Sequence, residues 1–381
     1  MSTATGTTAA PEALFKIERV QSWRATLRRA IAWKTARYTK GDIEATVVGL
    51  SDESGNTGYG YMPAMLIVGE SPVTAEALLH TAIGPLLKEE SSGVPDVMKK
   101  VDFAIGANYQ LKFAVEEALL DLQAKRMNTP LFNLFGGLSR RTVPVMRMLG
   151  LKPPKETAAE AKSFVDQGYR YVKIKIGLDD KRDLETVKIT RETLGDDVFI
   201  SVDANQSYAP MRAVKVLNQL ESSNLIVCEQ PVRRDDVRGM AFVRQHVRTP
   251  IMADEGVETA TDALRLIEAG GMDAVSIKLW KMGGYYKSRE IASVCSAANV
   301  GVHVGSTAGS QLMEAMQLHF CATIPELFAG AEIGEFASLN DDPVSGLMVK
   351  EGQLSVTDKP GLGVDIDMSK LQETTGFWQG K

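Results

Sequence analysis

Charged residues close a series of short apolar runs in the middle of this 381-residue chain. From Asp203 onwards these charged residues are separated by nearly equal intervals of sequence, so each repeat of the chain contributes one charged residue. Three of them are carboxylates, and carboxylates brought close together repel one another and raise each other's pKa unless a cation joins them. The charged residues are Lys173, Lys175, Asp203, Glu229, Asp254 and Lys278.

The three carboxylates predict a metal site. A single acidic residue at a strand end is most often a helix N-cap or a solvated loop residue. Asp203, Glu229 and Asp254 fall in consecutive repeats, however, and in a parallel barrel their side chains would converge on one rim. A hard divalent cation resolves their repulsion, and an all-oxygen shell with room for water suits Mg²⁺ better than Zn²⁺. We predict that these three residues bind Mg²⁺.

The lysines predict acid and base groups beside that metal. Lys173 and Lys175 are two residues apart on one strand and point to the same side, whereas Lys278 arrives from a strand four positions around the ring. A lone lysine at a strand end usually extends its charged end to water. A nearby cation and partial desolvation lower an ammonium pKa towards the range of a general base. We predict a catalytic set of Lys175 and Lys278 facing each other, with Lys173 adding to the pKa depression of Lys175.

A regular alternation of strands and helices must position these residues. The apolar runs are short and rich in β-branched residues, as buried parallel strands are, and stretches of helical spacing separate them. Eight such units favour a closed α/β barrel, a modified TIM barrel, over an open sheet, and barrels of this type hold their chemistry at the carboxyl ends of the strands. The expected strands are 143–149, 170–177, 198–203, 225–229, 250–254, 274–278, 300–305 and 331–336.

The chain is too long for one barrel of roughly 250 residues, so we expect a second module. Its N-terminal part alternates like a meander, with strands at 43–50 and 57–61 around a turn-rich loop, and helices follow at 72–87 and 111–125. A strand pair at 349–356 and 360–364 would pack back onto it. We predict an α+β capping domain at 13–140, a barrel domain at 141–336 and a C-terminal segment, 337–381, that returns to the cap.

Composition narrows the class of partner and compartment. The net charge of −5 and the pI near 5.6 argue against nucleic acid as a main partner. No apolar run approaches the roughly 20 residues that span a bilayer, and the first dozen residues show no secretory signal. Cys228, Cys295 and Cys321 lack the spacing of zinc or redox motifs. We expect a soluble cytoplasmic protein without a membrane partner.

Several short motifs resemble the enolase superfamily, in particular its muconate-lactonizing-enzyme subgroup, and the likeness covers nearly the whole chain. The resemblance implies a capping domain on a modified barrel, Mg²⁺ on the three carboxylates, Lys175 and Lys278 as acid and base, a small-molecule carboxylate substrate and a homo-oligomer. It also implies removal of the proton α to the carboxylate to give an enediolate. The motifs are Lys173-Ile-Lys175, Asp203-Ala-Asn205, Glu229-Gln-Pro231, Asp254-Glu255 and Ser276-Ile-Lys278, with similar segments at 129–137 and 360–363.

Two departures from the family pattern bear on specificity. A mandelate-racemase-like relative would use a seventh-strand His paired with a sixth-strand Asp, but the sixth strand here ends in Lys278, which leaves His303 as a packing or substrate-contact residue. In the cap, the family often places an acidic residue after a Gly-x-Gly turn, where this chain has Tyr61. A basic cluster at 24–34 could bind a second substrate carboxylate or form a solvated strand face. We predict substrate contacts from Arg28, Lys34, Asn205, Ser306 and Glu332.

The reaction itself stays open between three outcomes of one first step. Lysines on both faces of the α-carbon suit 1,1-proton transfer, so we predict a racemase or epimerase of an N-substituted amino acid, with an additional acidic group as an option. A cycloisomerase or a dehydratase would share the proton abstraction. A Schiff-base aldolase with lysine inside a barrel and a non-catalytic binding protein are the alternatives from other classes.

Overall fold

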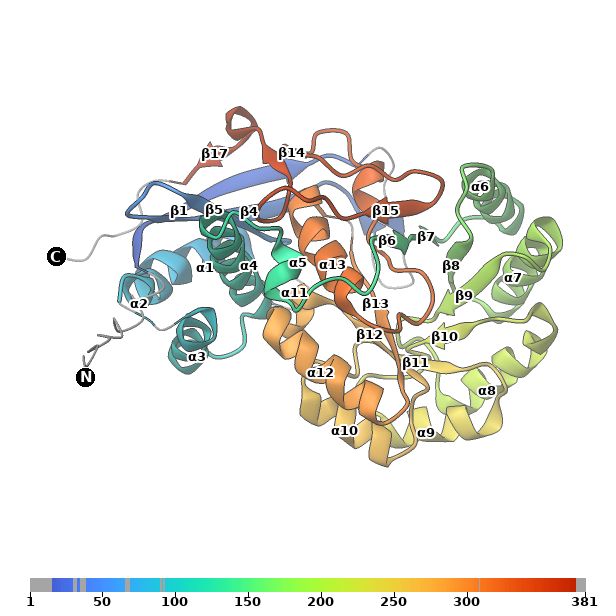
Figure 1. Cartoon of the computed structure of the whole chain (residues 1–381). Coiled ribbons are helices and arrows are strands. Elements are labelled where there is room, and N and C mark those ends of the chain that lie inside the picture. The colour runs from blue at the N-terminus through green and yellow to red at the C-terminus, as the bar shows by residue number, and fades with distance from the viewer. Residues whose placement is uncertain are drawn as a thin grey trace, which may run out of the picture.

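The computed structural model describes residues 16–29, 33–34, 39–65, 69–89, 91, 93–307 and 309–374. Figure 1 shows a cap of strands and helices, coloured blue to cyan, beside a barrel coloured green to orange, with the red tail lying back along the cap. The predicted combination of a modified barrel and an α+β cap is therefore confirmed. Throughout these residues, no helix is both long and apolar enough to cross a membrane.

The cap is built on an antiparallel sheet of order β17-β1-β4-β5. Its strands are β1 (Ile17–Leu27), β4 (Ile43–Asp52), β5 (Thr57–Met62) and β17 (Gln372–Glu373). Asp52 closes the hairpin between β4 and β5, because its side chain accepts hydrogen bonds from the backbone of Ser54 and Asn56. The expected meander is present, and two short strands, β2 (Trp33–Lys34) and β3 (Thr39–Lys40), pair with each other beside it.

Helices cover one face of this sheet, and α4 (Tyr109–Arg126) is the central one. Its close packing on β5 needs small residues, since a Cβ on Gly60 would overlap the backbone carbonyl of Ala114. The helix expected at 72–87 is interrupted by a π-helical turn, and α3 was not predicted. The cap helices are α1 (Pro72–Leu78), η2 (Leu79–Ile83), α2 (Gly84–Leu87), α3 (Val94–Ala104), α4 and α5 (Leu131–Leu134).

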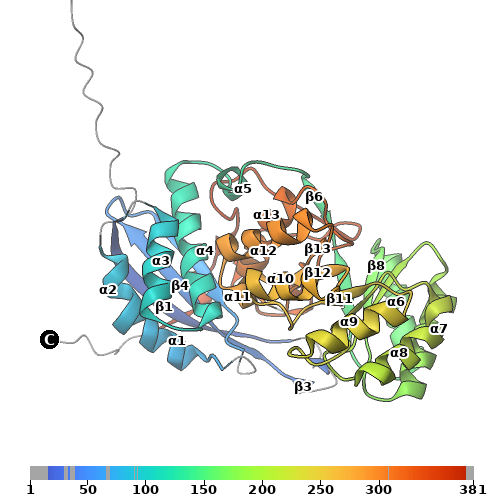
Figure 2. The same cartoon turned by 90° about the horizontal axis from the view of Figure 1, so that it is seen from below.

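The barrel strands form a parallel sheet of order β7-β8-β9-β10-β11-β12-β13 in the described residues. They are β7 (Met146–Leu149), β8 (Tyr171–Lys175), β9 (Phe199–Asp203), β10 (Val227–Glu229), β11 (Ile251–Ala253), β12 (Ala274–Ile277) and β13 (Gly301–Val304). Figure 2 shows the connecting helices around the outside. They are α6 (Pro154–Asp166), α7 (Asp180–Leu194), α8 (Pro210–Gln219), α9 (Val237–His246), α10 (Ala260–Glu268), α11 (Leu279–Met282), α12 (Tyr285–Ala297) and α13 (Gln311–Thr323).

The expected strand at 331–336 is wrong as a regular strand. Ala331 bridges Val145 and donates to the Pro144 carbonyl at 2.8 Å, and Glu332 donates to the Val304 carbonyl at 3.0 Å, so a short irregular segment closes the ring between β13 and β7. A positive φ at Ala329 breaks the extended backbone before it, and the 3₁₀ turn η4 (Glu335–Ser338) follows it.

The expected strand at 143–149 is likewise split. Its first half, β6 (Thr142–Pro144), pairs with β15 (Gln353–Ser355) of the tail, and only the second half, β7, joins the barrel sheet. The predicted pairing of 349–356 with 360–364 is therefore wrong. Instead β14 (Val344–Ser345) pairs with β16 (Asp365–Ile366), and β17 pairs with β1.

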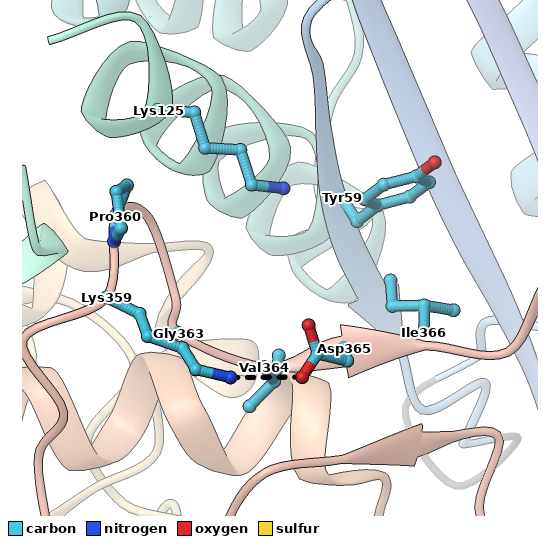
Figure 3. Close-up of a pocket in the computed structure, with 8 residues that line it drawn as sticks. All are labelled: Tyr59, Lys125, Lys359, Pro360, Gly363, Val364, Asp365 and Ile366. Atoms are coloured by element: carbon cyan, nitrogen blue, oxygen red, sulfur yellow. Dashed lines mark hydrogen bonds and ion pairs between the residues drawn. The ribbon is translucent and has the colours of Figure 1, made fainter. Parts of the chain in front are cut away.

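The tail does return to the cap, as expected. The amide of Leu362 donates to the side chain of Asp121 on α4 at 2.9 Å, and Gly361 lies so close to that carboxylate that a Cβ would overlap it. A cavity of about 430 Å³ lies at this junction, lined by Tyr59, Lys125 and tail residues 359–360 and 363–366. Figure 3 shows the residues that line it. An exposed Lys359–Asp365 ion pair of 3.1 Å lies at its edge. The domain boundaries at 140 and 336 remain our proposal.

His319 on α13 gives a prediction about stability at this junction. Its ring is buried, lies 5.7 Å from the Phe132 ring and donates from Nε2 to the Leu362 carbonyl at 3.3 Å. Burial lowers the pKa of His319 to about 4, from an ordinary 6.5. Between these two pH values the unfolded chain binds a proton at this histidine, whereas the folded chain does not. The free energy of unfolding therefore falls as the pH drops from 6.5 towards 4, by on the order of 3 kcal/mol.

We expect His319→Gln to remove that part of the pH dependence, because glutamine keeps a donor for Leu362 without titrating. Urea unfolding at pH 7 and pH 5 measures the difference, and His246→Gln, at an exposed position on α9, is the control. An unchanged pH dependence in His319→Gln would show that other groups cause the acid sensitivity.

Candidate active site at the carboxyl ends of the barrel strands

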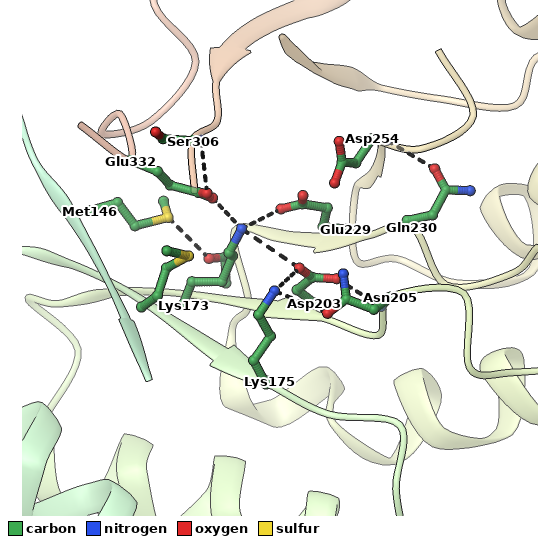
Figure 4. Close-up of polar contacts among 12 residues, drawn as sticks. Met146, Lys173, Lys175, Asp203, Asn205, Glu229, Gln230, Asp254, Ser306 and Glu332 are labelled. Atoms are coloured by element: carbon green, nitrogen blue, oxygen red, sulfur yellow. Dashed lines mark hydrogen bonds and ion pairs between the residues drawn. The ribbon is translucent and has the colours of Figure 1, made fainter. Parts of the chain in front are cut away.

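The parallel register aligns the predicted site residues along one edge of the barrel. Lys175, Asp203 and Glu229 are direct partners on β8, β9 and β10. Asp254 follows the end of β11, and Lys278 follows the end of β12. Because these positions share one face of their strands, the side chains meet inside the barrel mouth, and Figure 4 shows Lys175, Asp203 and Glu229 converging there.

The three carboxylates of this row are buried, at 0% exposure for Asp203 and Glu229 and 2% for Asp254. Each contacts a lysine. Lys175 donates to Asp203 in a very short contact, Lys173 donates to Glu229 at 2.7 Å, and Lys278 donates to Asp254 at 2.5 Å. Buried charges are tolerated only when they are paired in this way.

The lysines differ in how far they reach the open side of the row. Lys173 is 1% exposed and binds Glu229 and Glu332, so it lies beneath the carboxylates. Lys175 and Lys278 keep 9% and 12% of their side chains exposed, and they contact the two ends of the row. Three strands separate β8 from β12 in the sheet. Lys175 and Lys278 are thus brought to opposite ends of one carboxylate row, with Lys173 below it.

The protein's own carboxylates raise the pKa of two of these lysines, Lys173 and Lys278. Burial lowers the pKa of Lys278, but Asp254 and Glu229 outweigh it, and the pKa lies well above its ordinary value. The pKa of Lys173 is raised in the same way, since Glu229 and Glu332 outweigh its burial. The expected depression of the lysine pKa assumes a bound cation and stays a prediction, whereas the protein groups alone act in the opposite direction, because each of these two ammonium groups contacts more than one carboxylate.

Three residues that we did not select complete the cluster. Lys281, on α11, donates to Asp254 Oδ1 at 2.7 Å and also to the Asp254 carbonyl. Gln230 accepts through Oε1 from the amides of Asp254 and Gly256, which fixes the end of β11 against β10. Glu255 is half-buried and accepts through Oε1 from the side-chain amide of Asn205 at 3.3 Å. Only Glu255 and Gln230 had a signal in the sequence, because both stand within the motifs quoted above.

The predicted substrate contacts separate into two groups. Asn205 lies in the site and accepts from Lys175 at 3.0 Å. Glu332 is fully buried and holds Lys173, with the Ser306 amide at 3.3 Å from its other oxygen. Ser306 in turn donates to Glu314 at 3.0 Å. These contacts place Glu332 and Ser306 beneath the carboxylate row, and Asn205 beside Lys175.

The basic cluster of the cap is dispersed. Arg24 forms a two-bond ion pair with the buried Glu76, at 3.0 and 2.9 Å. Arg28 is 71% exposed and lies 3.7 Å from Asp341, which follows the barrel-closing segment. Lys34 is on β2, and its side chain lies outside the described residues. Within the described residues, Arg24 and Arg28 thus pair with Glu76 and Asp341 and not with the lysine and carboxylate row.

His303 is a packing residue in this structure. It is fully buried on β13, with Nε2 3.3 Å from Glu332 Oε1 and Nδ1 3.3 Å from the Phe328 carbonyl. Both ring nitrogens are therefore engaged inside the barrel. Of the two roles left open by the sequence, the contacts favour packing.

The carboxylate row suits a hard cation in its chemistry. Glu229 Oε1 is buried without a hydrogen-bond partner, and Lys278 is 3.7 Å away from it. A buried oxygen without a hydrogen-bond partner destabilises the folded protein unless another group or an ion binds it. As the side chains of the described residues stand, no three His, Cys, Asp or Glu groups could already hold an ion, because lysine ammonium groups lie between the carboxylates. The donor set, three anionic oxygen ligands with one unsatisfied, fits Mg²⁺.

Comparisons with known proteins identify similar chains over both parts of the molecule. A family model described as the mandelate racemase / muconate lactonizing enzyme N-terminal domain matches residues 20–136, and one described as enolase C-terminal domain-like matches residues 156–370. The L-Ala-D/L-Glu epimerase of Bacillus subtilis is 31% identical over 92% of this chain and 96% of its own. The N-succinyl-L-Arg/Lys racemase of Bacillus cereus is 30% identical over 93% and 96%.

A solved structure extends the likeness to a ligand-bound protein. The dipeptide epimerase of Enterococcus faecalis, complexed with Mg and the dipeptide L-Leu-L-Tyr, superposes with a TM-score of 0.87 at 27% identity and covers 92% of this chain and 99% of its own. The predicted resemblance is thereby confirmed at the level of sequence and fold.

Proposed function

This chain belongs to the mandelate racemase / muconate lactonizing enzyme family, and from that premise we propose that it is a Mg²⁺-dependent isomerase that inverts the α-carbon of an N-substituted amino acid. One observation carries the choice of reaction. Two accessible lysines contact opposite ends of one buried carboxylate row, Lys175 on Asp203 and Lys278 on Asp254. A substrate carboxylate above the row would have one lysine on each face of its α-carbon.

The proposed mechanism uses the two lysines in opposite roles. In its neutral form one of them removes the α-proton, and the other, as an ammonium group, donates a proton to the opposite face. The roles reverse for the other enantiomer. Asn205 orients Lys175 through its side-chain oxygen, and Lys281 holds Asp254 beside Lys278. Lys173 acts from beneath as a positioning residue for Glu229 and Glu332.

We propose Asp203, Glu229 and Asp254 as the residues that hold Mg²⁺. Bound there, the ion would supply positive charge that stabilises the negative charge developing on the substrate carboxylate. The orphaned oxygen of Glu229 and the Mg complex of the related dipeptide epimerase support this assignment.

The proposed substrate is an N-acylated amino acid or a dipeptide. Two of the relatives act, by their names, on a dipeptide and on N-succinyl amino acids. Arg28 would contact a second acidic group, because its guanidinium is exposed and its ion pair with the exposed Asp341 is long. Lys34 is the second proposed contact. A homo-oligomeric state and a cytoplasmic location remain predictions.

Exchange of the α-proton in D₂O tests this function. The enzyme with Mg²⁺ is incubated with single enantiomers of N-acetyl and N-succinyl amino acids and of dipeptides, and NMR and chiral chromatography follow deuterium and configuration. We expect one deuterium to enter with inversion, and faster exchange for succinyl than for acetyl derivatives. Inversion without deuterium would contradict the proposed proton transfer through two lysines, and no exchange when Mg²⁺ clearly raises the melting temperature would contradict this substrate class.

A cycloisomerase is the second candidate, because the matching family model is itself described by muconate lactonization. Conversion of a muconate to its lactone, without exchange of any amino acid derivative, would favour it. Loss of water from a hydroxy acid in the same assay would instead indicate a dehydratase.

A further inference from the structure

Two adjacent buried glutamates on cap helix α4 bind different parts of the molecule. Glu116 is 2% exposed and Glu117 is fully buried. Glu117 accepts from the amide of Tyr61 on β5 at 2.7 Å, inside the cap. Glu116 accepts through Oε1 from the amides of Tyr285 and Tyr286, the first residues of barrel helix α12. A carboxyl group of the cap domain therefore accepts hydrogen bonds from the N-terminal amides of a barrel helix.

The segment that Glu116 binds is the one that carries Lys278. Lys278 is the N-cap residue of α11, and its carbonyl accepts from the amides of Lys281 and Met282 at 2.8 and 3.1 Å. All four residues of α11 are buried. Gly283, in the left-handed region, ends α11, and α12 begins two residues later. A short, continuous piece of chain therefore joins Lys278 to the backbone amides that donate to Glu116.

A close approach makes this contact specific. Gly284 packs directly on Glu116, and a Cβ at that position would overlap the carboxyl group. Helix α11 also carries Lys281, which donates to Asp254. A displacement of α11 would thus move Lys278 and loosen Asp254 together, and misplacement of a catalytic group by about 1 Å can cost roughly 100-fold in rate.

We propose that Glu116 is a positioning residue that sets the place of Lys278 from the cap domain. This inference rests on the proposed function, in which Lys278 serves one enantiomer and Lys175 the other. Lys175 is on β8, at the other end of the carboxylate row, where it contacts Asp203. Loss of Glu116 should therefore impair α-proton exchange of one enantiomer only, which a general loss of stability would not do.

The protonation of Glu116 guides the choice of variants. Burial raises the pKa of Glu116 to about 8, against the two amide donors, which favour the charged form. The group is thus largely protonated at pH 7, and the contact depends on an acceptor oxygen rather than on charge. Glu116→Gln keeps that oxygen, whereas Glu116→Leu removes it and leaves two buried amides without a partner.

The experiment measures α-deuterium exchange of each enantiomer separately. The enantiomer served by Lys278 is the one whose exchange Lys278→Ala abolishes. For that enantiomer we expect Glu116→Leu to lower the exchange rate at least tenfold, with less than a threefold change for the other, and Glu116→Gln to restore both. Glu117→Leu is the matched control, because it removes an equally buried carboxyl group one position along α4 and should change both rates alike.

A substrate-free measurement separates failure of this inference from failure of the proposed function. Hydrogen exchange of the peptide covering 279–290 should be faster in Glu116→Leu than in Glu117→Leu, whatever the reaction is. If Glu116→Leu does not fold, Glu116→Asp, which withdraws the carboxyl group by one methylene, takes its place. Equal loss for both enantiomers, or the same imbalance in Glu117→Leu, would overturn the positioning role. Absence of exchange in the wild-type enzyme would count against the proposed function, while the peptide measurement still judges the contact.

Discussion

Lys175→Ala and Lys278→Ala are each expected to abolish inversion, with a loss of at least roughly 1,000-fold, a magnitude typical of losing a general acid or base. Each lysine serves one face of the α-carbon, so inversion needs both. The remaining lysine can still remove and return a proton on its own face. One enantiomer should therefore exchange its α-proton for deuterium in each variant without changing configuration, and the two variants should retain opposite enantiomers.

Single-enantiomer exchange in D₂O with chiral analysis measures both effects. Lys215→Ala, at an exposed position on α8, is the control and should leave inversion and exchange unchanged. Full inversion by either site variant would exclude the two-base mechanism. A covalent adduct trapped by borohydride, with activity unaffected by EDTA, would support the Schiff-base alternative instead.

The strand ends were predictable from the sequence because their signal is local. Each of Asp203, Glu229 and Asp254 closes a β-branched run of its own, and parallel pairing necessarily brings such ends to one rim. The same reasoning located Lys175 and Lys278. The barrel, the cap and the returning tail were correct for the same reason, as alternation of strand and helix is written in short windows of sequence.

The second layer of the site was not predictable, because it depends on backbone geometry. Lys281 reaches Asp254 only through the short helix α11, whose four residues carry no helical period of their own. Glu116 contacts α12 across 169 residues of sequence. The eighth strand failed because Ala329 takes a left-handed conformation, which its residue type does not indicate. Non-local contacts and strained backbone are what a single sequence leaves open.

The buried carboxylates of the row explain why the pKa values of Lys173 and Lys278 lie above their ordinary range. The expectation of a lower lysine pKa assumes a bound cation and stays a prediction, and the structure itself places Lys173 and Lys278 among several buried carboxylates. Opposite charges within a few ångströms favour the charged form of each group, and here they outweigh desolvation at Lys173 and Lys278. These ion pairs position the lysine and the carboxylate side chains alike.

Glu229→Gln is expected to remove the response of the protein to Mg²⁺. Wild-type protein should gain stability from the ion, by about 2.7 kcal/mol at a concentration 100 times its Kd, since a ligand of the folded state stabilises it by mass action. Glu229 is central in the row, and its Oε1 is the buried oxygen without a hydrogen-bond partner. An amide oxygen is similar in shape but carries no charge, so the affinity for a hard cation should fall sharply.

The melting temperature with and without 10 mM MgCl₂ measures this effect, and turnover after EDTA treatment is the second readout. We expect the Mg²⁺-induced shift to disappear in Glu229→Gln and the turnover to fall by at least roughly 100-fold, as for loss of a major electrostatic contribution. Glu76→Gln is the matched control, because Glu76 is equally buried but is paired with Arg24 in the cap. An undiminished Mg²⁺ shift in Glu229→Gln would place the ion elsewhere, and a loss of the shift in Glu76→Gln as well would mean that both variants report on folding rather than on the row.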